Sequence, residues 1–144
     1  MIKNLSEYFL PEQEFYLHKI NYDRITSGEA GIRKSEISLN CADNIVVDVN
    51  DLDEVKLVVT RSLYFEPEEM FCLSVAFGAE LKINPKKKND YNWHELNLAE
   101  EFRDNGEFVM VNLMSRISLL IAQITSSFGQ QPLMLPPNII KTTE

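Results

Sequence analysis

The sequence predicts an α+β domain in which a four-stranded antiparallel sheet is followed by two helices packed on one of its faces. Strand-like segments fill residues 15–83, and helical periodicity begins only after a polar loop at 84–93. The gaps between the strand-like segments are of hairpin size, and no repeat or linker divides the chain. The 144 residues are therefore expected to form a single domain over 1–144.

The composition, with 44% hydrophobic and 25% charged residues, is typical of a soluble globular protein. The net charge of −8 argues against binding to nucleic acid or to an anionic membrane, because both need a basic surface. The N-terminus has no apolar stretch of signal-peptide length. The longest apolar run, 107–128, is interrupted by Asn, Arg, Gln and several Ser and Thr. We expect no membrane insertion and a cytoplasmic location.

The first strand is predicted at 15–25, after a lead-in over residues 1–13. Its apolar residues change parity part-way along the strand, which predicts a β-bulge near His18-Lys19. The residues that define the change are Phe15, Leu17, Ile20 and Tyr22.

After a loop at 26–31, strand character continues towards Cys41 and resumes at 44–50. An acidic turn at 48–54 then leads into a β-branched and aromatic strand at 54–65.

The clearest strand spans Met70–Ile83, because large apolar side chains alternate with small ones throughout it. One face carries Phe71, Leu73, Val75, Phe77, Ala79, Leu81 and Ile83. The other face carries Cys72, Ser74, Ala76 and Gly78 before its first charge at Glu80. Small side chains on the second face predict a close neighbour there, and a glycine within a strand indicates a close backbone approach or a bulge.

Two helices are predicted, at 94–103 and at 107–128. The longer helix has one apolar face, formed by Ile117, Leu120, Ile121, Ile124 and Phe128. Its opposite face is small instead of charged, and consists of Ser115, Ser118, Ala122, Thr125 and Ser126. We expect this small face to pack against the same helix of another copy. The tail at 130–144 is apolar and rich in proline, so it should lie extended against the body or a neighbour.

The sequence offers little for catalysis or metal binding. His18 and His94 have no metal-ligand spacing with Cys41 or Cys72, and the two cysteines are expected to be buried thiols instead of a disulfide. No phosphate-binding or nucleophile motif occurs. Glu80 could be an edge charge, an interface charge or, least favourably, a catalytic acid. We therefore expect no enzyme activity, no cofactor and no metal.

The loop at 84–93 is expected to be solvated around Lys86–Lys88. Tyr91 and Trp93 could stack on nucleic acid bases, but the acidic charge favours a packed loop anchor.

Three stretches resemble the family of the bacterial protein-export chaperone SecB. They are the strand Phe71–Ile83 with its central glycine, the helix segment Arg116-Ile-x-x-Leu120-Ile, and the tail segment Pro132-Leu-Met-Leu-Pro-Pro-Asn-Ile139. The strand Glu54–Leu63 also fits, and the likeness covers about residues 54–140. Phe77-Gly78 stands where the family has paired glycines, and the tail lacks the residue usually found between proline and asparagine.

The resemblance implies a sheet-then-helices fold and a homodimer or homotetramer formed through the long helix. It implies the binding of unfolded polypeptide clients in apolar grooves and their delivery to the translocation ATPase SecA. The interface is expected at Ser115, Ser118, Ala122, Thr125, Cys72, Ser74, Ala76 and Gly78. Peptide binding is expected at Phe77, Phe128, Leu133, Leu135 and Ile139.

Three functions follow from these observations. The first is a SecB-like chaperone or adaptor for extended polypeptide, acting in protein export. The second is an oligomeric structural or regulatory protein of the same fold, with one dedicated protein partner and no export role. The third, and least favoured, is an enzyme whose pocket joins two of Glu80, His18 and His94.

Overall fold

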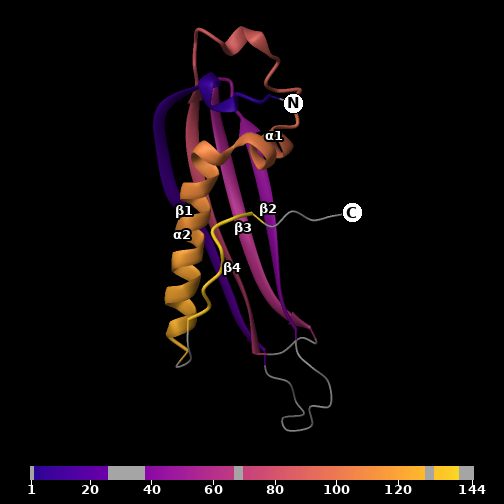
Figure 1. Ribbon diagram of the computed structural model, residues 1–144, viewed down its shortest axis with the longest axis vertical. Helices are drawn as coiled ribbons and strands as arrows, with labels where there is room; N and C mark the ends of the chain where they lie inside the picture. The colour runs from indigo at the N-terminus through magenta and orange to yellow at the C-terminus, as the bar shows by residue number, and fades with distance from the viewer. Residues whose placement is uncertain (1, 26–37, 67–69, 129–131, 140–144) are drawn as a thin grey trace.

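The computed structural model describes residues 2–25, 38–66, 70–128 and 132–139. Its elements are a 3₁₀ turn (Leu5–Tyr8), β1 (Phe9–Ile25), β2 (Ser38–Val49), β3 (Glu54–Glu66), β4 (Met70–Ile83), a second 3₁₀ turn (Lys88–Asp90), α1 (Leu98–Asn105) and α2 (Glu107–Ser126). The strands form one antiparallel sheet in the order β1-β4-β3-β2. Both helices lie on the same side of this sheet (Figure 1). The predicted fold class is confirmed.

Several boundaries differ from the prediction. β1 begins at Phe9, within the expected lead-in, and its register is irregular between Phe9 and Gln13, where Pro11 has no amide proton to donate. β2 is one continuous strand. α1 begins at Leu98 instead of His94, because the Asn97 side chain caps it by accepting a hydrogen bond from the Glu100 amide. The loop at 26–31 lies outside the described residues.

The predicted bulge in β1 is confirmed by a register shift between Leu17 and Lys19. Leu17 pairs with Phe77 of β4, whereas Ile20 pairs with Val75 and Tyr22 with Leu73. All three partners have side chains on the helix-facing side of β4. The bulge therefore puts Leu17, Ile20 and Tyr22 on the same face, although their sequence positions differ in parity.

The core lies between the helix-facing side of the sheet and α2. Val55, Leu57, Val59, Val75 and Leu81 of the sheet are buried, as are Leu113, Ile117 and Ile121 of α2. By length and composition α2 could also cross a membrane. In the structure it packs on β4 and β3 instead, as a core helix does. Gly106 lies between the two helices. A side chain does not fit at this position, because an added Cβ would lie 2.3 Å from the carbonyl oxygen of Phe102.

Trp93 anchors the loop that precedes α1. Its side chain is buried, its ring contacts those of Tyr8 and Phe9, and its Nε1 donates a 3.0 Å hydrogen bond to the Lys88 carbonyl. This confirms the loop anchor predicted from the sequence. The neighbouring lysine Lys87 remains partly exposed and pairs with Glu7 at 3.5 Å.

Candidate functional site

Arg61 is the most unusual residue in the helix-facing side of the sheet. In β3 it follows the alternation of Val55, Leu57 and Val59, so its side chain points into the core. Its guanidinium is fully buried, at 0% exposure. A buried arginine is stable only if its N–H groups all find acceptors.

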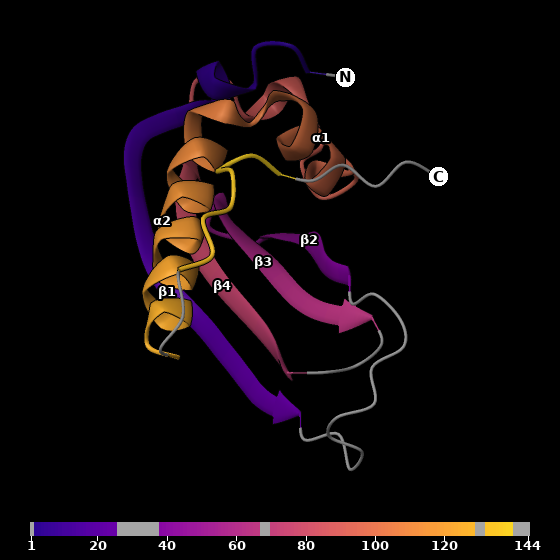
Figure 2. The ribbon, with the colours of Figure 1, turned by 60° about the horizontal axis from the view of Figure 1, so that its bottom comes forward.

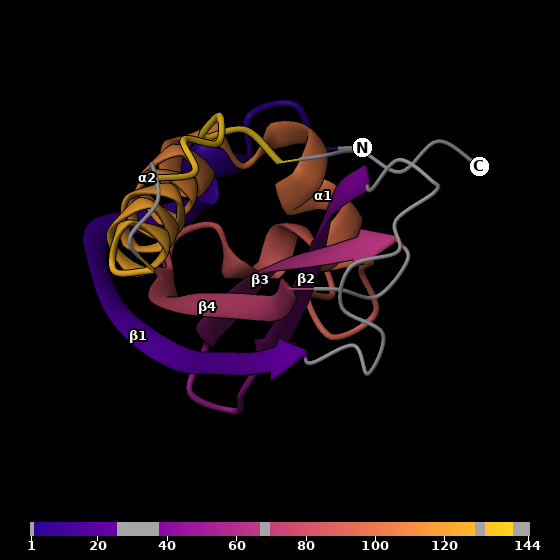
Figure 3. The same cartoon turned by 90° about the horizontal axis from the view of Figure 1, so that it is seen from below.

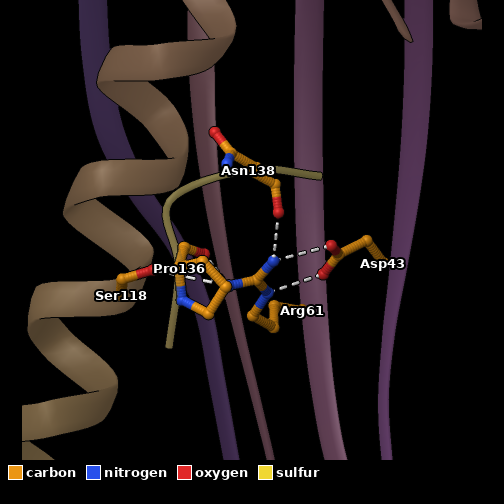
Figure 4. Close-up of polar contacts among 5 residues, drawn as sticks. All are labelled: Asp43, Arg61, Ser118, Pro136 and Asn138. Atoms are coloured by element: carbon orange, nitrogen blue, oxygen red, sulfur yellow. Dashed lines mark hydrogen bonds and ion pairs between the residues drawn. The ribbon is translucent and has the colours of Figure 1, made fainter. Parts of the chain in front are cut away.

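The five donors of Arg61 are all used (Figure 4). Nε and Nη2 each donate a 2.8 Å bond to one carboxylate oxygen of Asp43, which faces Arg61 across the β2–β3 pair. Nη1 donates to the Pro136 carbonyl at 2.8 Å and to Ser118 Oγ at 3.4 Å, and Nη2 donates to the Asn138 carbonyl at 2.7 Å. Arg61 therefore joins β2, α2 and the C-terminal tail.

Two opposing effects act on the pKa of Arg61. Burial disfavours the charged guanidinium most strongly, but the hydrogen bonds and charge of Asp43 outweigh it and raise the pKa of Arg61. Burial also raises the pKa of the neighbouring Cys41 thiol, so this cysteine stays protonated.

The tail, residues 132–139, lies beside α2 as an extended segment (Figure 2). The Leu133 amide donates a 2.9 Å bond to Thr125 Oγ1, whose own proton goes to the Ile121 carbonyl at 2.8 Å. Leu133 and Leu135 turn towards the core, whereas Met134 between them is 78% exposed. We call Arg61, Ser118 and Thr125 together the tail site.

The small face of α2 packs against a different neighbour from the one predicted. Ser118, Ala122 and Thr125 are buried within a single copy, and Ser118 and Thr125 take part in the polar contacts of the tail site. The close neighbour that their size predicts is thus the chain's own tail. Ser115 remains exposed. An association of two copies through this helix stays a prediction.

A second surface lies on the other side of α2, towards β1. Leu17, Ile20 and Tyr22 face the helix side of the sheet but are 50%, 41% and 43% exposed. The ring of Tyr22 lies 5.2 Å from that of Phe128, which follows α2 and is 36% exposed. Both rings also contact Phe71. We call Leu17, Ile20, Tyr22 and Phe128 the β1–α2 surface.

The predicted peptide-binding residues are divided between these two regions. Phe128 lies in the β1–α2 surface, and Phe77 is partly buried opposite Leu17. Leu133, Leu135 and Ile139 belong to the tail and pack against the core of the same chain. Whether these residues bind peptide stays a prediction.

The remaining predicted interface residues, Cys72, Ser74, Ala76 and Gly78, lie on the opposite side of the sheet, which no described helix covers (Figure 3). We call this side the open sheet face. The close approach expected at Gly78 comes from the ring of Tyr16 on β1, whose Cζ would be 2.2 Å from an added Cβ. The glycine thus makes room for an aromatic cross-strand neighbour.

The candidate catalytic residues are not gathered into one site. His18 lines one hollow of the open sheet face, together with Asp48 and Lys56. Glu80 lines an adjoining hollow with the same two residues, and neither hollow includes His94. Among the described residues, no group of His, Cys, Asp and Glu could hold a metal ion.

Arg61 and Asp43 were not predicted as site residues from the sequence, although a signal for them exists. Each charge stands at a core-facing position of its strand, in line with apolar residues two positions away. The division of β2 into two stretches hid the position of Asp43. The exposure of Leu17 and Tyr22 has no such signal, because it depends on how far α2 extends over β1.

No family model and no curated protein sequence matches the chain. Its structure is similar to the SecB-like chaperone Rv1957 of Mycobacterium tuberculosis, solved in complex with a ChAD peptide from the HigA1 antitoxin Rv1956. The TM-score is 0.67 at 12% identity, with 92% of this chain and 88% of that chain covered. The fold is SecB-like.

A protein of unknown function from Streptococcus agalactiae is also similar, at a TM-score of 0.43 and 12% identity. The match covers 87% of this chain and 95% of that chain.

Proposed function

We propose that this protein is a SecB-like chaperone or adaptor that binds extended, apolar segments of unfolded polypeptide on the β1–α2 surface. The observation that carries the proposal is the set of large apolar side chains left exposed there. Tyr22 and Phe128 are in ring contact and remain more than one third exposed. Large apolar side chains that the described residues leave exposed mark an interaction site.

The backbone next to this surface supports an extended ligand. β1 is at one edge of the described sheet, so its outer N–H and C=O groups have no strand partner among the described residues. An added peptide strand can hydrogen-bond to such an edge without a sequence requirement, while its apolar side chains contact exposed rings. The similar mycobacterial chaperone, solved with a peptide from another protein, is consistent with this class of ligand.

The proposal is tested by the aggregation of a client protein. Insulin reduced with dithiothreitol aggregates, and light scattering follows its aggregation. We expect wild-type protein at stoichiometric amounts to suppress the signal and the Tyr22→Ser, Phe128→Ser double variant to lose most of this effect. Leu52→Ser is the matched control, because Leu52 is 77% exposed but lies in the β2–β3 turn. Wild-type protein without any effect would overturn the proposal.

We further propose that the protein acts as a homodimer or homotetramer in the cytoplasm and has no catalytic role. Val111 and Leu119 are exposed on α2, one turn before and after Ser115, and offer a line of contact for a second copy. Ser115→Arg should therefore lower the mass measured by light scattering. A wild-type monomer would contradict this assembly.

The export role is a narrower proposal. If the protein delivers clients for export, SecA should bind the wild-type protein in a pull-down, and a client should increase the amount bound. If one folded partner is captured instead and no unfolded client competes with it, the protein is an adaptor with a dedicated partner.

A further inference from the structure

The tail is itself an extended apolar peptide bound to this protein. Among the described residues, the hydrogen bonds that hold it involve its main chain: the Leu133 amide, the Pro136 carbonyl and the Asn138 carbonyl. Its side chains contribute through the alternating Leu133 and Leu135. A site that reads the main chain and alternating apolar residues accepts many sequences.

The protein half of the site is held in place by the Asp43–Arg61 ion pair. Asp43 binds Nε and one N–H of Nη2, so it fixes the plane of the Arg61 guanidinium. The remaining N–H groups point at the tail carbonyls and at Ser118. These donors are buried, and losing the tail would leave two of them without their carbonyl partners. A ligand with two carbonyl groups in the same positions can accept hydrogen bonds from these two donors instead.

The tail half of the site is less buried than the protein half. Leu133, Leu135 and Ile139 are only partly buried, and the intervening Met134 and both Pro136 and Pro137 are exposed. A segment with few buried contacts opens at a lower free energy than the core. The tail is therefore an occupant that can leave while the site that receives it stays formed.

We propose that the tail site is a second binding site for extended apolar polypeptide, and that the tail is its resident occupant, which a client segment replaces. The choice of client rests on the proposed function. Because the tail is joined to α2, it competes at a high effective concentration and weakens the apparent affinity of the site. A client that is already bound to the β1–α2 surface also has a high effective concentration at the tail site and can therefore displace the tail.

The test measures the binding of a fluorescein-labelled peptide with the tail sequence 132–139 to the full chain by fluorescence anisotropy. The Leu133→Asp, Leu135→Asp double variant weakens the competing tail without changing the tail site. It should bind the peptide about tenfold more tightly than the wild type, because a larger fraction of sites is free. Met134→Asp, at the exposed position between them, should match the wild type. Leu133→Ser with Leu135→Ser replaces the double variant if that variant does not fold.

The location of the peptide is tested in the same double variant. Thr125→Val removes the acceptor for the Leu133 amide while keeping the shape of the side chain, so it should weaken binding several-fold. Ser126→Val, at an exposed position, should not. Equal peptide affinity in the wild type and the double variant, or an effectless Thr125→Val, would overturn the proposal.

Two further outcomes separate this inference from the proposed function. If Tyr22→Ser with Phe128→Ser abolishes binding of the tail peptide, the peptide lies on the β1–α2 surface, and the inference fails while the proposed function stands. If Leu133→Asp with Leu135→Asp converts a dimer into a monomer by light scattering, the occupant is the tail of a second copy, which also overturns it.

Discussion

The two sides of α2 differ in whether another segment of the chain covers them. On the tail side of the helix, Thr125 accepts a hydrogen bond from the Leu133 amide, and Ser118 accepts one from Arg61, which also donates to the Pro136 carbonyl. On the β1 side the neighbours are Tyr22 and Phe128, which remain partly exposed. Small polar residues let a segment of the same chain approach closely, whereas large apolar residues leave a surface that favours an external partner.

The largest effect is expected on the tail side. Asp43→Ala should lower the free energy of unfolding by about 3–5 kcal/mol, because it leaves the buried charge of Arg61 without its partner. Urea denaturation measures this loss. Glu80→Ala is the matched control: it breaks the exposed Lys56–Glu80 pair at 3.8 Å and should cost less than about 1 kcal/mol. Equal losses would mean that the buried pair does not stabilise this side.

A moderate effect is expected where the tail meets the helix. Thr125→Val leaves the Leu133 amide without an acceptor, which should cost about 1–2 kcal/mol and speed hydrogen exchange of that amide. Mass spectrometry of exchanged fragments detects the change. Ser126→Ala, on the exposed side of the same turn, should leave exchange in the tail unaltered. Unchanged exchange in Thr125→Val would show that this bond does not hold the tail.

On the β1 side, truncation should cost little stability. Phe128→Ala should lower the unfolding free energy by about 1 kcal/mol, as for many partly exposed positions. Phe71, whose ring lies 5.2 Å from that of Phe128, is 7% exposed, and Phe71→Ala should cost about 3–5 kcal/mol. Similar losses for the two variants would mean that Phe128 is a core residue and not part of a binding surface.

The smallest effect concerns pH. Burial raises the pKa of Cys41 above its ordinary value of 9.0, so the folded state favours the neutral thiol. The unfolded chain ionises first as the pH rises, and stability should therefore fall above pH 9.0. In Cys72→Ser, the rate of alkylation of Cys41 by iodoacetamide should rise with a midpoint above this pH. A midpoint below it would contradict the burial of the thiol.

The fold could be predicted from the sequence because its main signals are local. The alternation in Met70–Ile83 gave the central strand, and the change of parity around His18 gave the bulge. That bulge also determines the β1–α2 surface, since it brings Leu17 and Tyr22 to one face.

The sites were harder to predict because they depend on segments that are distant in sequence. Arg61 meets Pro136 and Asn138 only after the tail has turned back along α2, so the small residues of the helix predicted another copy instead of the tail. The exposure of Tyr22 likewise depends on where α2 ends relative to β1. Local periodicity in the sequence predicts neither the contacts of Arg61 with the tail nor the exposure of Tyr22.

The claim that polypeptide binds on the β1 side of α2 is tested most directly by hydrogen–deuterium exchange with and without a permanently unfolded client, such as reduced and carboxymethylated α-lactalbumin. β1 and β2 are the two edges of the described sheet, which makes β2 the internal control. We predict slower exchange in β1 around Leu17–Tyr22 when the client is present, and no change in β2. Protection of β2 alone, or of neither edge, would contradict the proposed function.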